Sequence, residues 1–113
     1  MLRPFLIATA LSLVVLVSGT AAASAASCSP PKYPGSGYFT SLKVTKVSCS
    51  TGKKVTLAHY KCRVKHGKTG RCVSKVLGYS CRETRRSIST EIDGTVTCKR
   101  GSKKVVYSYQ QDT

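Results

Sequence analysis

The fold is decided by residues 95–109, which read TVTCKRGSKKVVYSY. Apolar and polar side chains alternate on both sides of a short turn that contains Gly101, and tight turns favour glycine. After the turn, Val105 and Tyr107 alternate with Val106, so they point to one face of a strand. The pattern predicts a β-hairpin whose second strand ends in aromatic residues.

Upstream of the hairpin, two segments differ in hydropathy. Residues 73–81 are rich in apolar and aromatic side chains and predict a strand that ends at Cys81. Residues 82–93 hold three arginines and three of the four acidic residues of the chain. We therefore predict a polar connection over residues 82–93.

The first half of the domain predicts a strand and then a helix. Residues 38–47 alternate as a strand, with Leu42 and Val44 on one face. After Cys49, either Ser50 or Thr51 can cap a helix. Within residues 52–64, side chains of low polarity recur at helical spacing at Val55, Ala58 and Cys62. The same residues would also fit a strand, because Val55 and Leu57 alternate with Thr56.

These elements define an α+β fold over residues 38–113. We expect one helix packed on a small antiparallel or mixed sheet of three to four strands. Residues 27–37 contain three prolines and two glycines, so we expect an irregular arm there.

The N-terminus predicts export. Residues 1–26 contain one basic residue, then an apolar run, then a tract of small residues, which is the order of a signal peptide. The apolar run is too short to span a bilayer. Cleavage is expected just before Ser27. A lipoprotein signal at Cys28 is disfavoured, because Ala25 stands where such a signal has leucine. We expect a secreted, extracellular protein.

Composition makes disulfides necessary. The mature 87 residues lose Arg3 and none of the four acidic residues, so they carry 18 basic and 4 acidic side chains, a net charge of +14. Only 15 of the 87 are Leu, Ile, Val or Phe, a composition typical of disordered chains. The six cysteines, at 28, 49, 62, 72, 81 and 98, all lie in the mature part and predict three disulfides. Their spacing does not suit a metal site, and no cofactor is expected.

The pairing of the cysteines is harder to predict, because six cysteines allow 15 connectivities. We expect a pair between Cys62 and Cys72 across the basic loop that separates them. If the chain returns from the helix to place its second strand beside the first, the other pairs are Cys49 with Cys81 and Cys28 with Cys98.

Three short motifs support this organisation: Val47-Ser48-Cys49, Gly78-Tyr79-Ser80-Cys81 and Val96-Thr97-Cys98-Lys99-Arg100-Gly101. Their order resembles that of small secreted cysteine-containing proteins from actinobacteria, over residues 38–109. The resemblance implies secretion, an α+β fold and structural roles for Cys49, Cys81 and Cys98. It implies no activity.

Clustered charge is the strongest functional signal. One cluster surrounds the loop after the predicted helix and the other surrounds the hairpin turn. Such clusters favour polyanions such as cell-wall polymers, acidic polysaccharides or extracellular nucleic acid, and also anionic membrane surfaces. They can equally serve solubility alone. The candidate anion-binding residues are Lys61, Arg63, Lys65, Lys68, Arg71, Lys75, Lys99, Arg100, Lys103 and Lys104.

Tyrosines accompany the basic residues and could stack on bases or sugars, but strand residues usually supply a core. We expect Tyr79 and Tyr107 in the core, and Tyr33 and Tyr38 exposed.

We therefore predict a monomeric, non-catalytic binding module for an anionic partner outside the cell. The first alternative is a small cationic nuclease, whose acid, base and cation would come from His59, His66, Glu83, Glu91 and Arg85 or Arg86. The second is an antagonist. It would act on membranes, or it would block a protease by presenting Lys65, Lys68 or Arg71.

Overall fold

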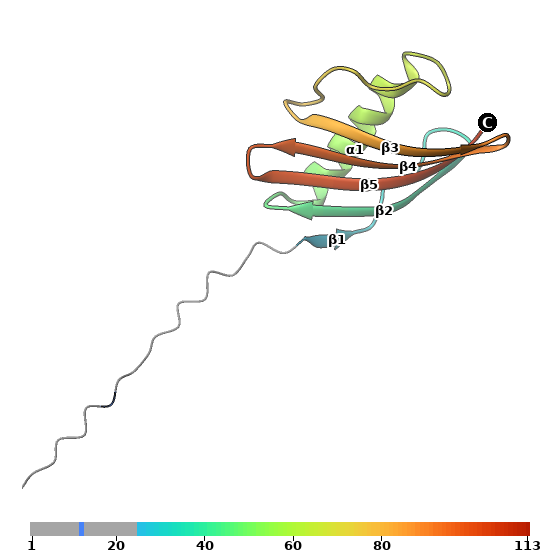
Figure 1. The fold of residues 1–113 in the computed structure, drawn as a ribbon. Helices are drawn as coiled ribbons and strands as arrows, with labels where there is room; N and C mark the ends of the chain where they lie inside the picture. The colour runs from blue at the N-terminus through green and yellow to red at the C-terminus, as the bar shows by residue number, and fades with distance from the viewer. Residues whose placement is uncertain (1–11, 13–24) are drawn as a thin grey trace, which may run out of the picture.

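A computed structural model gives the fold and describes residue 12 and residues 25–113 (Figure 1). The predicted signal peptide, residues 1–26, lies outside the described residues apart from Ser12, Ala25 and Ala26. No helix within the described residues is long and apolar enough to cross a membrane. The domain is α+β, and its elements in chain order are β1 (Ala26–Cys28), β2 (Gly37–Thr45), α1 (Cys49–Val64), β3 (Ser80–Ile88), β4 (Glu91–Arg100) and β5 (Lys103–Asp112).

All five strands form one antiparallel sheet in the order β1-β2-β5-β4-β3. The helix α1 lies across one face of this sheet, and no described element covers the other face (Figure 1). The prediction of one helix on a small antiparallel sheet with three disulfides is confirmed. The sheet has five strands, whereas three to four were predicted.

The hairpin formed by β4 and β5 is the centre of the sheet. Its strands pair from Glu91 opposite Asp112 down to Arg100 opposite Lys103. The turn between them contains Gly101, which has a φ of 58°, a backbone conformation that glycine adopts without steric cost. The predicted hairpin is therefore confirmed.

The strand β3 replaces most of the predicted polar connection over residues 82–93. It is an edge strand with one face open to solvent, so the outward residues Arg82, Thr84 and Arg86 are polar. Its inward residues include Glu83 and Arg85, which pair with each other. Both faces are polar, and for that reason the hydropathy pattern did not reveal the strand. The strand predicted over residues 73–81 was wrong for most of its length. Residues 73–79 form a loop with one bridge between Val76 and Tyr79, and only Ser80 and Cys81 belong to a strand, as the start of β3.

The helix expected within residues 52–64 is present. It begins earlier than predicted, because the N-cap is Ser48 and not Ser50 or Thr51. Ser48 is extended, and its hydroxyl accepts a hydrogen bond of 3.1 Å from the backbone N–H of Thr51. The buried residues of α1 are Gly52, Val55, Thr56, His59 and Arg63.

The core lies between α1 and the covered face of the sheet. Tyr79 and Tyr107 are buried there as predicted, and Tyr38 is exposed as predicted. Tyr33 was expected to be exposed, but it is 6% exposed. The arm, irregular after β1, folds back so that the Tyr33 ring packs edge-on against Phe39, with 4.8 Å between ring centroids.

The disulfides connect neighbouring elements. Cys62 pairs with Cys72 as predicted. The pairs Cys49–Cys81 and Cys28–Cys98 were wrong, because β4 and β5 separate β2 from β3 in the sheet. Cys28 on β1 instead reaches Cys49 at the start of α1, and Cys81 bonds to Cys98, which lies directly opposite it on β4.

Candidate anion-binding surface

Nine of the ten candidate anion-binding residues are exposed. They do not form one surface. The loop cluster lies around the C-terminal end of α1, where the backbone carbonyl of Lys68 accepts a hydrogen bond from Gln111 near the end of β5. The tip cluster surrounds the opposite end of β5, at the β4–β5 turn. The loop cluster is Lys61, Lys65, Lys68, Arg71 and Lys75, and the tip cluster is Lys99, Arg100, Lys103 and Lys104.

Arg63, the tenth candidate, belongs to the core. Its exposed fraction is 0%, and its guanidinium stands 4.1 Å from the ring centroid of Tyr109. It donates hydrogen bonds of 2.9 Å to the side-chain oxygen of Gln111 and 3.0 Å to the hydroxyl of Tyr33. Burial acts to lower the pKa of Arg63, but the hydrogen bond with Tyr33 and the neighbouring tyrosines raise it above its ordinary value. Arg63 is thus a buried structural cation that cannot reach a partner in solution.

The buried arginine helps to join four segments of the chain. The Tyr33 hydroxyl donates a hydrogen bond of 2.5 Å to Gln111, which also accepts from Arg63. The amide nitrogen of Gln111 donates 2.7 Å to the carbonyl of Lys68. Arm, helix, strand β5 and loop are therefore fixed relative to one another by this buried polar network, in which the Nε of Arg63 is the one guanidinium nitrogen that is buried without a hydrogen-bond partner.

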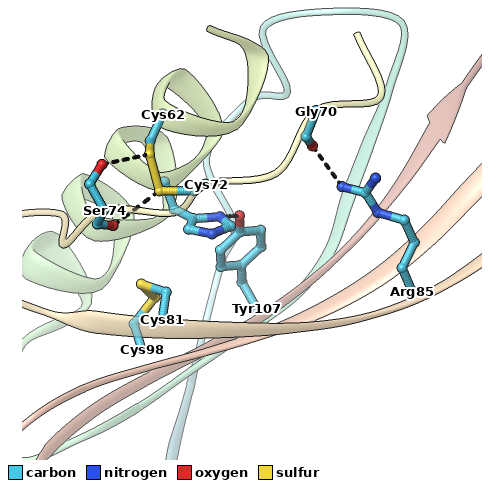
Figure 2. Close-up of a disulfide and its surroundings, with 9 residues drawn as sticks. Cys62, Gly70, Cys72, Ser74, Cys81, Arg85, Cys98 and Tyr107 are labelled. Carbon is cyan, nitrogen blue, oxygen red and sulfur yellow. Dashed lines mark hydrogen bonds between the residues drawn. A yellow bond between two sulfur atoms is a disulfide. The ribbon is translucent and has the colours of Figure 1, made fainter. Parts of the chain in front are cut away.

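A second buried cation, Arg85, holds the same loop from β3. It donates to Glu83 at 2.5 Å and to the backbone carbonyl of Thr69 at 2.7 Å. It also donates to the backbone carbonyl of Gly70 at 2.8 Å (Figure 2). The side chains of Glu83 and Arg85 are each 7% exposed. Arg71 approaches the same carboxylate at 3.7 Å. With the Cys62–Cys72 disulfide, these contacts position the basic loop on the scaffold.

His59 lies beside these groups on α1. It is 2% exposed, and its Nδ1 forms a hydrogen bond with the hydroxyl of Tyr107. Burial lowers the pKa of His59 to about 4 and raises the pKa of Tyr107 above its usual range. Both groups are therefore neutral at pH 7.

The residues proposed for a nuclease are dispersed. His59 and Glu83 are inside the domain, His66 is exposed in the loop after α1, and Glu91 begins β4. Arg85 is engaged with Glu83 and the loop, and Arg86 is on the open face of the sheet. Within the described residues, no group of three or more His, Cys, Asp or Glu side chains could hold a metal ion.

The open face of the sheet contains a group of polar side chains of which the sequence analysis had named only Lys99 as a candidate. Between β3 and β4 lies a shallow hollow of about 470 Å³. The alternation of Thr95, Thr97 and Lys99 with Val96 and Cys98 was the signal that could have revealed it. The hollow is lined by Ser80, Arg82, Thr84, Thr95, Thr97 and Lys99.

Comparison with known proteins returned no match among protein-family models, curated proteins or solved structures. The three disulfides suggest an oxidising environment.

Proposed function

We propose that this protein is a secreted, basic, non-catalytic module that binds an anionic partner outside the cell or in the cell envelope. The observation that carries the proposal is the exposed tip cluster, which lies at the opposite end of the β4–β5 hairpin from Glu91, Asp93 and Asp112. Nine of the ten candidate anion-binding residues are exposed. The buried carboxylate of Glu83 pairs with Arg85, and Arg71 of the loop cluster approaches it at 3.7 Å.

The other three acidic residues support the same proposal by their position. Glu91 lies opposite Asp112 in the sheet, and Asp93 lies opposite Gln110. They gather at the end of the β4–β5 hairpin that is farthest from the tip cluster. These three acidic side chains therefore do not offset the positive potential of the tip cluster, which attracts polyanions and raises their rate of association.

Binding across a salt series tests the proposal. The exported, oxidised protein is applied to a sulfated matrix and to the neutral form of the same matrix. We expect retention on the sulfated matrix that persists at about 0.15 M salt, where charges farther apart than about 8 Å are screened. Replacing Lys103 and Lys104 with glutamine should weaken retention. Elution of the wild type below that salt concentration would contradict the proposal, because the charge would then serve only solubility.

An RNA cleavage assay with the same protein preparation tests the nuclease alternative. RNA is added to the protein and its length is followed. Intact RNA is expected, and cleavage that disappears in His66→Gln would favour the enzyme instead.

A further inference from the structure

We propose that the hollow between β3 and β4 on the open face recognises a carbohydrate or polyol chain that bears phosphate or sulfate groups. This inference rests on the proposed function and assigns it a site and a ligand class. The site is distinct from the loop cluster and shares only Lys99 with the tip cluster.

The chemistry of the lining carries the assignment. Of its six side chains, Arg82 and Lys99 are cations and the other four are hydroxyls. None is acidic, so nothing in the lining repels an anion. A guanidinium and an ammonium bind phosphate and sulfate oxygens, while Ser and Thr hydroxyls both donate to such oxygens and exchange hydrogen bonds with sugar hydroxyls.

The register of the sheet arranges these groups in rows across the strands. Thr84 lies opposite Thr95, which lies opposite Ser108, and the hydroxyls of Thr95 and Ser108 are 3.2 Å apart. This hydroxyl row crosses three strands. Beside it, Arg82 lies opposite Thr97, and in the following row Lys99 lies opposite Lys104. A chain lying across the strands beside the hydroxyl row would meet Arg82 and Thr97 in the next row, and Lys99 and Lys104 one row farther on.

A disulfide on the covered face of the sheet links the two strands that form the hollow. Cys81 and Cys98 are bonded on the covered side of the sheet, with 4.0 Å between their Cα atoms (Figure 2). Their chain neighbours, which include Arg82 and Lys99, project from the opposite face. A covalent link at this position fixes the backbone positions that carry Arg82 and Lys99 before a ligand arrives, which lowers the entropic cost of binding.

The composition of the lining favours a carbohydrate over a nucleic acid. Sequence-tolerant binding of single strands depends on aromatic side chains that stack on bases. The hollow has none, and the exposed Tyr38 is on β2, in the row of Gln110 and Asp93. Hydroxyls and cations without an aromatic platform suit a sulfated or phosphorylated glycan.

Matched charge variants test the site. Dextran sulfate, unmodified dextran and oligo-dT serve as probes for the exported, oxidised protein. The variant Arg82→Gln/Lys99→Gln removes two charges from the hollow, and Lys61→Gln/Lys65→Gln removes two from the loop cluster. We expect the first to weaken dextran sulfate binding by about tenfold or more, and the second by less than about threefold. A third variant, Thr84→Val/Thr97→Val, should weaken binding without changing the net charge.

Each of the alternative outcomes contradicts a different part of the proposal. Equal losses in the two charge variants overturn the hollow as the site and leave the proposed function standing. Absence of dextran sulfate binding by the wild type overturns both. Oligo-dT that binds as tightly as dextran sulfate, and that loses affinity in Arg82→Gln/Lys99→Gln, overturns the ligand class.

Discussion

At the scale of single residues, His59 links the stability of the domain to pH. Its pKa is about 4 in the folded protein and about 6.5 in an unfolded chain, so the folded state favours the neutral ring. The stabilisation is complete above pH 6.5 and is lost as pH falls from about 6.5 to 4. The free energy of unfolding should decrease by about 3 kcal/mol over that range, measured by urea denaturation at a series of pH values.

The two histidines of the chain provide a matched comparison. His59→Gln removes the titrating ring from the core and should flatten the pH dependence between 6.5 and 4. The second histidine, His66, is exposed, so His66→Gln should leave that dependence unchanged. If the curves of wild type and His59→Gln run parallel, the assignment of this pH dependence to His59 is wrong.

At the scale of elements, β3 depends on its disulfide. It is an edge strand whose one neighbour in the sheet is β4. The Cys81–Cys98 bond spans 17 residues of sequence, and removing such a link costs about 3 kcal/mol. Cys81→Ala/Cys98→Ala should therefore speed amide hydrogen exchange in β3 more than in β5. Cys62→Ala/Cys72→Ala should instead loosen the loop after α1. Equal protection of β3 in the two variants would show that backbone pairing alone holds the strand.

The elements also show what the sequence could predict. The β4–β5 hairpin, the helix and the Cys62–Cys72 pair follow from local patterns, because their partners are close in the chain. The strand β3 could not be recognised, since its inward positions hold the ion pair of Glu83 and Arg85 in place of apolar residues. The Cys81–Cys98 pair depends on recognising β3, and the Cys28–Cys49 pair depends on how β1 lies beside the start of α1, which hydropathy does not determine.

The candidate site was predictable only in part, for a related reason. Exposed lysines of both clusters were found from their density in the sequence. Arg63 was misplaced because a buried arginine in a helix has the same sequence signal as an exposed one. The hollow was missed because it combines residues of two strands, one of which had not been recognised.

At the scale of the whole molecule, three disulfides compensate for a small core and a high charge. Residues 27–113 have a net charge of +14, which disfavours a compact state through self-repulsion. Each disulfide contributes about 2–4 kcal/mol, so the three together match or exceed the net stability of a domain this small. Reduction at pH 7 should therefore unfold the protein, which would appear as lost amide dispersion in its NMR spectrum.

Reduction also separates the contribution of the fold from that of charge, because the unfolded chain keeps the same net charge. If recognition depends on the arranged rows of the open face, the reduced protein should bind dextran sulfate at least about tenfold more weakly than the oxidised protein at the same salt concentration. Capping the reduced thiols with a neutral reagent keeps the chain reduced throughout the titration. An unfolded, capped chain that binds as tightly as the folded protein would mean that charge density alone produces the affinity, and that the disulfides serve stability without shaping a site.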